Sequence, residues 1–179
     1  MNDFRIIDTH CHLDFKELKT RLDEVIKDAK INNVTDMVTI STNLSRIDTI
    51  KDISEQYQEV FFTVGVHPNE AHKDKRYDDH HFIENYSNHE KCVGIGEGGL
   101  DYFYNMDNMK FQKRSLEVQI NVARSTNLPM IIHSRDADND MIEILKSEYK
   151  NGPFRAILHC FSSGAVSYTH LTLPTIYSV

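Results

Sequence analysis

Short apolar runs rich in β-branched residues recur along this chain of 179 residues, and a stretch of helical spacing separates each run from the next. This alternation is typical of strand–helix units around a parallel sheet. It predicts strands at residues 5–12, 34–42, 60–67, 92–100, 129–135 and 155–160. It predicts helices at residues 18–31, 45–57, 77–88, 111–125 and 138–149. Open doubly wound sheets and closed barrels both fit this pattern.

The residues at the end of the first predicted strand help to distinguish these two folds. It reads Asp8-Thr9-His10-Cys11-His12, and no GxGxxG fingerprint follows it, which disfavours a doubly wound nucleotide-binding fold. Because side chains alternate along a strand, His10 and His12 share one face and Cys11 points to the other. Two imidazoles about 7 Å apart can bind one cation when neighbouring strands supply further ligands. The alternative for an isolated HxH motif is a pair of polar residues at a strand end.

Later predicted strands also end in a lone polar residue. Glu97, His133 and His159 each follow an apolar run. An unpaired carboxylate or imidazole at such a depth costs several kcal/mol, so each needs a partner. In a barrel the carboxyl ends of all the parallel strands open onto one mouth. Four histidines and one glutamate at that mouth indicate a hydrolytic site in which the carboxylate bridges two cations.

Five segments carry a family resemblance. They are DTHCHLDF at 8–15, GVHPNEAH at 65–72, GIGEGGLDYFY at 94–104, MIIHSRDA at 130–137 and LHCFSS at 158–163. In this order they resemble the motifs of TatD-type metal-dependent deoxyribonucleases. The resemblance implies a (β/α)8 TIM barrel of the metal-dependent hydrolase type. About six of the eight strands are expected here, within a partial barrel domain at residues 1–165.

The resemblance also implies the reaction and the ligands. The reaction is hydrolysis of DNA phosphodiester bonds, at 3′ ends or in single strands, through a water activated by two metals. His10 and His12 would bind the first divalent ion, His133 and His159 the second, and Glu97 would bridge them. The family's last-strand aspartate is not found, because no Asp or Glu follows Glu148. No catalytic residue is therefore assigned.

The identity of the two divalent ions stays open. Imidazole-rich ligand sets with one carboxylate suit zinc or manganese better than calcium. Magnesium remains an alternative, because a substrate phosphate would add oxygen ligands.

Three further residues are expected around the site. His67 and Arg135 are candidates for binding the substrate phosphate, against a His-Pro turn and a solvated arginine as alternatives. Asp101 is expected to accept a hydrogen bond from a ligand histidine, against a helix N-cap as its alternative. Cys11 and Cys160, on the opposite strand parity to the ligands, are expected to pack against the outer helices.

Charge and composition limit the classes of partner. A net charge of −7 provides no broad basic surface, so DNA is not expected to be held by many lysine–phosphate contacts. Bound dications would supply the positive charge instead. No apolar run reaches the about 18 residues of a membrane span and no secretory signal is visible, so a cytoplasmic protein is expected. No stable protein partner is predicted.

The last residues, 166–179, differ from the rest of the chain. The segment VSYTHLTLPTIYSV has no charged side chain and contains a proline, so it does not continue the family's next amphipathic helix. It resembles a sequencing adapter translated as protein, and we expect it to lie outside the family domain. A short edge strand is the alternative.

Two other functions compete with DNA hydrolysis. An amidohydrolase-type cyclic amide or ester hydrolase uses a similar HxH site but often bridges its metals with a carboxylated lysine, and Glu97 disfavours that class. The other alternative is an inactive metal-binding fragment, which the absence of a last-strand acid favours.

Overall fold

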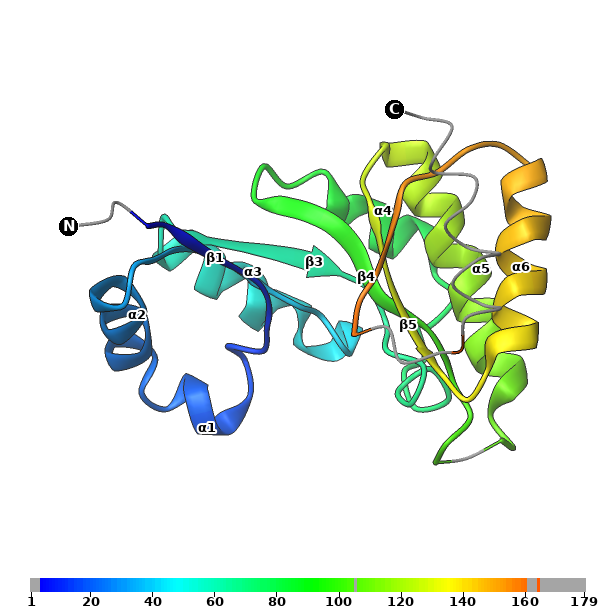
Figure 1. Ribbon diagram of the computed structural model, residues 1–179, viewed down its shortest axis with the longest axis horizontal. Helices are drawn as coiled ribbons and strands as arrows, with labels where there is room; N and C mark the ends of the chain where they lie inside the picture. Colours follow the sequence, from blue (N-terminus) through cyan, green and yellow to red (C-terminus); the bar gives the residue numbers. More distant parts are fainter. Residues whose placement is uncertain (1–3, 105, 161–163, 165–179) are drawn as a thin grey trace.

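The computed structural model describes residues 4–104, 106–160 and 164 and contains one curved sheet (Figure 1). All pairs of neighbouring strands are parallel, and the strand order β1-β2-β3-β4-β5-β6 follows the chain. The strands are β1 Ile6–Cys11, β2 Val34–Thr39, β3 Val60–Val64, β4 Cys92–Asp101, β5 Met130–Arg135 and β6 Ala156–Leu158. This sequential parallel order confirms the predicted α/β class and is the arrangement of a barrel wall.

Helices connect successive strands. They are α1 Lys16–Lys19, α2 Leu22–Ile31, a 3₁₀ turn η1 Leu44–Arg46, α3 Ile47–Gln56, α4 His80–Ser87, α5 Met109–Thr126 and α6 Asp138–Lys150. The helix α2 packs against β2, and α1 packs against α2. Figure 1 shows α5 and α6 beside β5. None of the helices in the described part of the chain is long and apolar enough to cross a membrane.

Two predicted helices differ from the structure. The expected helix at 18–31 is divided into α1 and α2, because Arg21 has the non-helical angles φ −135° and ψ 37°. Next to it, the Thr20 hydroxyl donates to the Lys16 carbonyl, a local bond that competes with helix continuation. The expected helix at 77–88 begins only at His80, where the Asp79 carboxylate caps it by accepting the Phe82 N–H.

The core lies between the sheet and its helices. In the larger cluster Leu116 and Ile120 of α5 are buried with Phe62, Ile95 and Met130 of the strands. A smaller cluster, under α2, contains Leu13, Ile26, Met37, Ile53 and Val60, and Cys11 packs against it as predicted. Burial of such side chains contributes about 25 cal/mol per Å², so the two clusters fix the sheet from its helical side.

The strand ends are the part of the sheet that bears on function. β1 and β3 stop at Cys11 and Val64, earlier than predicted, so His12 and His67 lie in loops just beyond them. Cys160 is exposed, and its prediction was wrong: its φ of +48° turns the backbone out of strand alternation directly after β6. The predicted boundary of the tail at residues 166–179 lies outside the described residues.

Candidate metal centre

Three of the four histidines predicted as ligands contact the buried carboxylate of Glu97, the fifth predicted ligand. His10 Nε2 lies 3.2 Å from Glu97 Oε2, while His133 Nδ1 and His159 Nε2 lie 3.0 and 2.8 Å from Oε1. These imidazoles come from β1, β5 and the residue after β6, and Glu97 comes from β4. The curvature of the sheet therefore brings strands far apart in the sequence to a single carboxylate.

His12 lies beside this cluster, with its ring centroid 5.3 Å from that of His10. Its Nδ1 is 3.2 Å from the Ile40 carbonyl. Because a carbonyl can only accept, Nδ1 carries the proton and the lone pair is on Nε2, the form in which an imidazole binds a metal. The Phe15 ring stacks on His12 at 4.7 Å and fixes its plane.

The ligand atoms form two groups around Glu97. Those of His10, Glu97 and His159 lie within 4.8 Å of one another, and those of His67, Asp101 and His133 form a second such group. The ring of His159 stacks on that of His10 at 4.0 Å, whereas the ring of His133 is 5.9 Å away. The resemblance pairs His159 with His133, whereas in this structure its nearer imidazole is His10.

Asp101 contacts His133 from the side opposite Glu97. His133 Nε2 lies 3.2 Å from Asp101 Oδ2, which also accepts a hydrogen bond from Asn69 Nδ2 at 2.9 Å. The imidazole thus lies between two carboxylates. Burial alone would lower the pKa of His133, but its hydrogen bonds with Glu97 and the charge of Asp101 outweigh burial and raise the pKa above its ordinary value.

The same contacts control the ionisation of Glu97. Burial would raise its pKa, but hydrogen bonds from His10, His133 and His159 hold the pKa far below its usual range. Glu97 is therefore anionic at neutral pH, as a ligand for cations must be.

The two residues predicted to bind phosphate lie at the rim of the cluster. Burial lowers the pKa of His67 to about 4, so its imidazole is neutral at neutral pH. Its Nδ1 accepts the Asn69 N–H at 3.1 Å, which leaves Nε2–H as a donor 3.8 Å from Glu97. Arg135, at the end of β5, lies with its guanidinium carbon 3.7 Å from the ring centroid of Phe103.

Several residues for which the sequence predicted no role hold these groups in place. Gln112 and Gln119 are buried in α5, on the face that packs against the sheet. Gln112 bonds both backbone groups of Asp101, and Gln119 does the same for Val66, the residue before His67. Glutamines on the apolar face of a predicted helix were the available signal, because a buried amide needs a hydrogen-bond partner.

A glycine two residues after Glu97 permits the close approach of β4 to β5. Gly99 has φ +153°, and a Cβ there would lie 1.9 Å from the carbonyl oxygen of His133. Only glycine tolerates this contact, so the GEGG sequence brings Glu97 and His133 into reach.

A family model described as TatD related DNase matches residues 7–179. The chain belongs to the TatD family. The family predicted from the five motifs is thus confirmed, and its curated members include uncharacterised proteins as well as one named a deoxyribonuclease.

The relatives span more than this chain does. YabD of Bacillus subtilis, named an uncharacterised metal-dependent hydrolase, is 38% identical over 160 residues, 89% of this chain and 62% of that protein. Human deoxyribonuclease TATDN3 is 31% identical over 170 residues, 87% of this chain and 60% of that protein. The chain thus spans about 60% of the length of these curated TatD relatives.

Solved structures support the same fold. The crystal structure of YjjV, a TatD homologue from Escherichia coli, superimposes with a TM-score of 0.83 at 25% identity, over 94% of this chain and 64% of that one. A TatD family hydrolase from Entamoeba histolytica superimposes with a TM-score of 0.75 at 23% identity, over 93% and 62%.

The donor set fits divalent cations. Four imidazoles, the ionised Glu97 and the nearby Asp101 supply nitrogen and oxygen donors of the kind that zinc and manganese bind. His12 already has the tautomer that a metal requires, through Ile40. Both features suit the binding of divalent cations by these residues.

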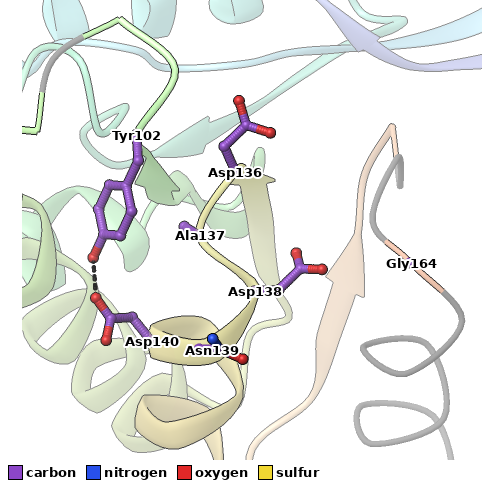
Figure 2. A pocket seen from close by; sticks show the side chains of 7 residues that line it. All are labelled: Tyr102, Asp136, Ala137, Asp138, Asn139, Asp140 and Gly164. Atoms are coloured by element: carbon purple, nitrogen blue, oxygen red, sulfur yellow. Dashed lines mark hydrogen bonds between the residues drawn. The ribbon is translucent and has the colours of Figure 1, made fainter.

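A cavity of about 620 Å³ lies beside this centre rather than at it. Figure 2 shows its lining, in which the Tyr102 hydroxyl donates a hydrogen bond to the Asp140 carboxylate at 2.6 Å. Asp136 and Asp138 also line it. Because three aspartates face this space, it does not suit a phosphate, and the histidine cluster is the better candidate for the reaction site.

Proposed function

We propose that the protein is a metal-dependent hydrolase that cleaves DNA phosphodiester bonds. Its active site would lie at the carboxyl ends of β1, β4, β5 and β6. The observation that carries this proposal is the buried carboxylate of Glu97 in contact with imidazoles from β1, β5 and the residue after β6. The name of human TATDN3 supports DNA as the substrate class, and the name of YabD supports metal dependence.

The proposed ligands are those predicted from the sequence: His10, His12, Glu97, His133 and His159. They would hold two divalent ions, zinc, manganese or magnesium. When bound, such ions polarise a phosphoryl oxygen and lower the pKa of a water molecule. They would also offset the net charge of −7 that otherwise opposes DNA binding.

The remaining residues have proposed roles at stated atoms. His67, neutral at pH 7, would donate Nε2–H to a phosphate oxygen, and Arg135 would pair with a neighbouring phosphate. Asp101 would keep His133 in one orientation through their 3.2 Å contact. No general base is assigned within this sequence.

The test is hydrolysis by the full chain after removal of metal with a chelator. Adding Zn²⁺, Mn²⁺ or Mg²⁺ should restore cleavage of single-stranded DNA labelled at its 5′ end, and the product lengths distinguish attack at 3′ ends. Glu97→Gln keeps the shape but removes the charge, so it should lower the rate by about 100-fold. Glu90→Gln, an exposed position before the same strand, is the matched control and should retain the rate.

Three results would contradict the proposal. Equal DNA cleavage by Glu97→Gln and by the unmodified chain would mean that another site hydrolyses DNA. Metal-dependent turnover of a hydantoin or an ester without DNA cleavage would support the amidohydrolase class. Metal binding without turnover of either substrate would support the inactive alternative.

A further inference from the structure

The segment that follows β4 exposes two neighbouring aromatic rings. Phe103 and Tyr104 are 55% and 68% exposed, and their ring centroids are 4.9 Å apart. This segment projects from the body of the molecule (Figure 1). Because exposing adjacent large apolar groups to water is unfavourable, such a pair on a protein surface is a candidate binding surface.

Arg135 covers one side of this pair. Its guanidinium carbon lies 3.7 Å from the Phe103 centroid and 5.1 Å from the Tyr104 centroid. An atom 3.7 Å from a ring centre lies over the ring's face, because the ring's own edge atoms keep an in-plane neighbour farther away. The guanidinium thus occupies one face of Phe103, and the exposure of the ring leaves its other side open to a flat ligand.

The rings are tied to the candidate metal centre by the backbone. Phe103 N–H donates to Asp101 Oδ1 at 3.1 Å, and Asp101 Oδ2 contacts His133. Two residues of backbone span at most about 7 Å, so the Cα atom of Phe103 lies within that distance of the Cα atom of Asp101. Arg135 lies opposite Asp101 in the register of the parallel strands β4 and β5, so Arg135 belongs to the same rim.

We propose that Phe103, Tyr104 and Arg135 form a stacking surface for an unpaired nucleobase adjacent to the phosphate being cleaved. The proposal rests on the proposed function and names the groups that would hold an unpaired base of the single strand or frayed end already expected as substrate. An aromatic face binds any base and contributes about tenfold or more in affinity. Bases inside a duplex already stack on each other and cannot use the surface. On an acidic protein, stacking supplies attraction that lysines do not.

The test uses the absence of tryptophan from the sequence. Phe103→Trp introduces a single indole, whose fluorescence a stacked base quenches. The full chain with added Zn²⁺ is titrated with a single-stranded phosphorothioate oligothymidylate, which resists hydrolysis, and with a phosphorothioate abasic oligonucleotide of the same length. We expect quenching by the first and none by the second. Tyr149→Trp, at an exposed aromatic position of α6, is the matched control and should show no quenching.

A second variant tests affinity without the new indole. Phe103→Ala should weaken binding of labelled oligothymidylate about tenfold, measured by anisotropy, and leave binding of the abasic strand unchanged. Tyr149→Ala should bind both strands as the unmodified chain does. Circular dichroism checks that both variants are folded.

The outcomes separate the stacking surface from the proposed function. Equal quenching by both strands, no quenching, or unchanged affinity in Phe103→Ala would overturn the stacking surface, even if the chain cleaves DNA. Base-dependent binding without metal-dependent cleavage would overturn the proposed function and retain the stacking surface. Quenching that rises with protein concentration in the absence of DNA would assign the rings to a second copy of the chain and overturn the proposal.

Discussion

At the scale of the residue, the main feature of the candidate metal centre is how the negative charge of a buried carboxylate is stabilised. Glu97 is buried among three imidazole contacts, and an uncompensated charge there would cost several kcal/mol. In the metal-free protein the imidazoles supply that compensation. The residues that would bind cations thus also support the fold when no cation is bound.

His133 gives this compensation a dependence on pH. Its pKa is raised, so the fold favours the imidazolium. The resulting stabilisation is fully present below the ordinary histidine pKa of about 6.5 and is lost as the pH rises through the raised value. With chelator present, we expect the unmodified chain to exceed His133→Gln in Tm most at about pH 6 and least at about pH 9.

A surface histidine provides the control for that measurement. His72 is exposed, and His72→Gln should show the Tm of the unmodified chain at every pH tested. A Tm difference for His133→Gln that grows with pH would show that His133 is neutral in the folded protein, contrary to its position between two carboxylates.

At the scale of the element, α5 positions the rim of the sheet through its buried amides. Gln119 accepts the Val66 N–H at 3.2 Å and donates to the Val66 carbonyl at 3.1 Å. It also donates to the Ser115 hydroxyl at 3.0 Å. Because Val66 precedes His67, the helix controls where that imidazole points.

Removing this amide should destabilise the protein. Gln119→Met keeps the volume but leaves both backbone groups of Val66 buried without a partner. Each such group costs about 1–3 kcal/mol, so we expect a loss of about 3 kcal/mol in the free energy of unfolding, measured with urea. The exposed Asn121 of the same helix provides the control: Asn121→Ala should change stability by about 0.5 kcal/mol or less. Equal stability of the two variants would contradict the role given to Gln119.

At the scale of the whole molecule, the sheet has two edges within the described residues. β1 and β6 each pair with one neighbour, and Ile7 and Ile157 on them are exposed. Unpaired strands with exposed apolar side chains are templates for pairing with another chain. The stacking surface lies elsewhere, after β4.

We therefore expect the purified chain to self-associate through these edges. The double variant Ile7→Lys and Ile157→Lys should shift the sedimentation distribution toward the monomer, because lysines at strand edges oppose pairing. Ile31→Lys, at an exposed isoleucine at the end of α2, is the control and should leave the distribution unchanged. A monomeric unmodified chain at all concentrations would refute this expectation.

Local pattern was enough to predict the order of the elements and the kinds of residues at the centre. The alternation of side chains along a strand predicted that His10 and Cys11 point to opposite faces. An apolar run followed by one polar residue identified Glu97, His133 and His159. The predicted boundaries of the helices were less accurate. The non-helical backbone angles of Arg21 separate α1 from α2, and the Asp79 side chain caps the start of α4.

The sequence by itself determined which side chains reach the carboxyl ends of the strands, because alternation and burial are properties of neighbouring residues. Only the tertiary structure decided which of them meet. The register shift between Ile95 and Gly98, the curvature of the sheet and the buried amides of α5 place His159 against His10 and His133 between two carboxylates. Distances between strands depend on packing across the whole sheet, which no single segment specifies.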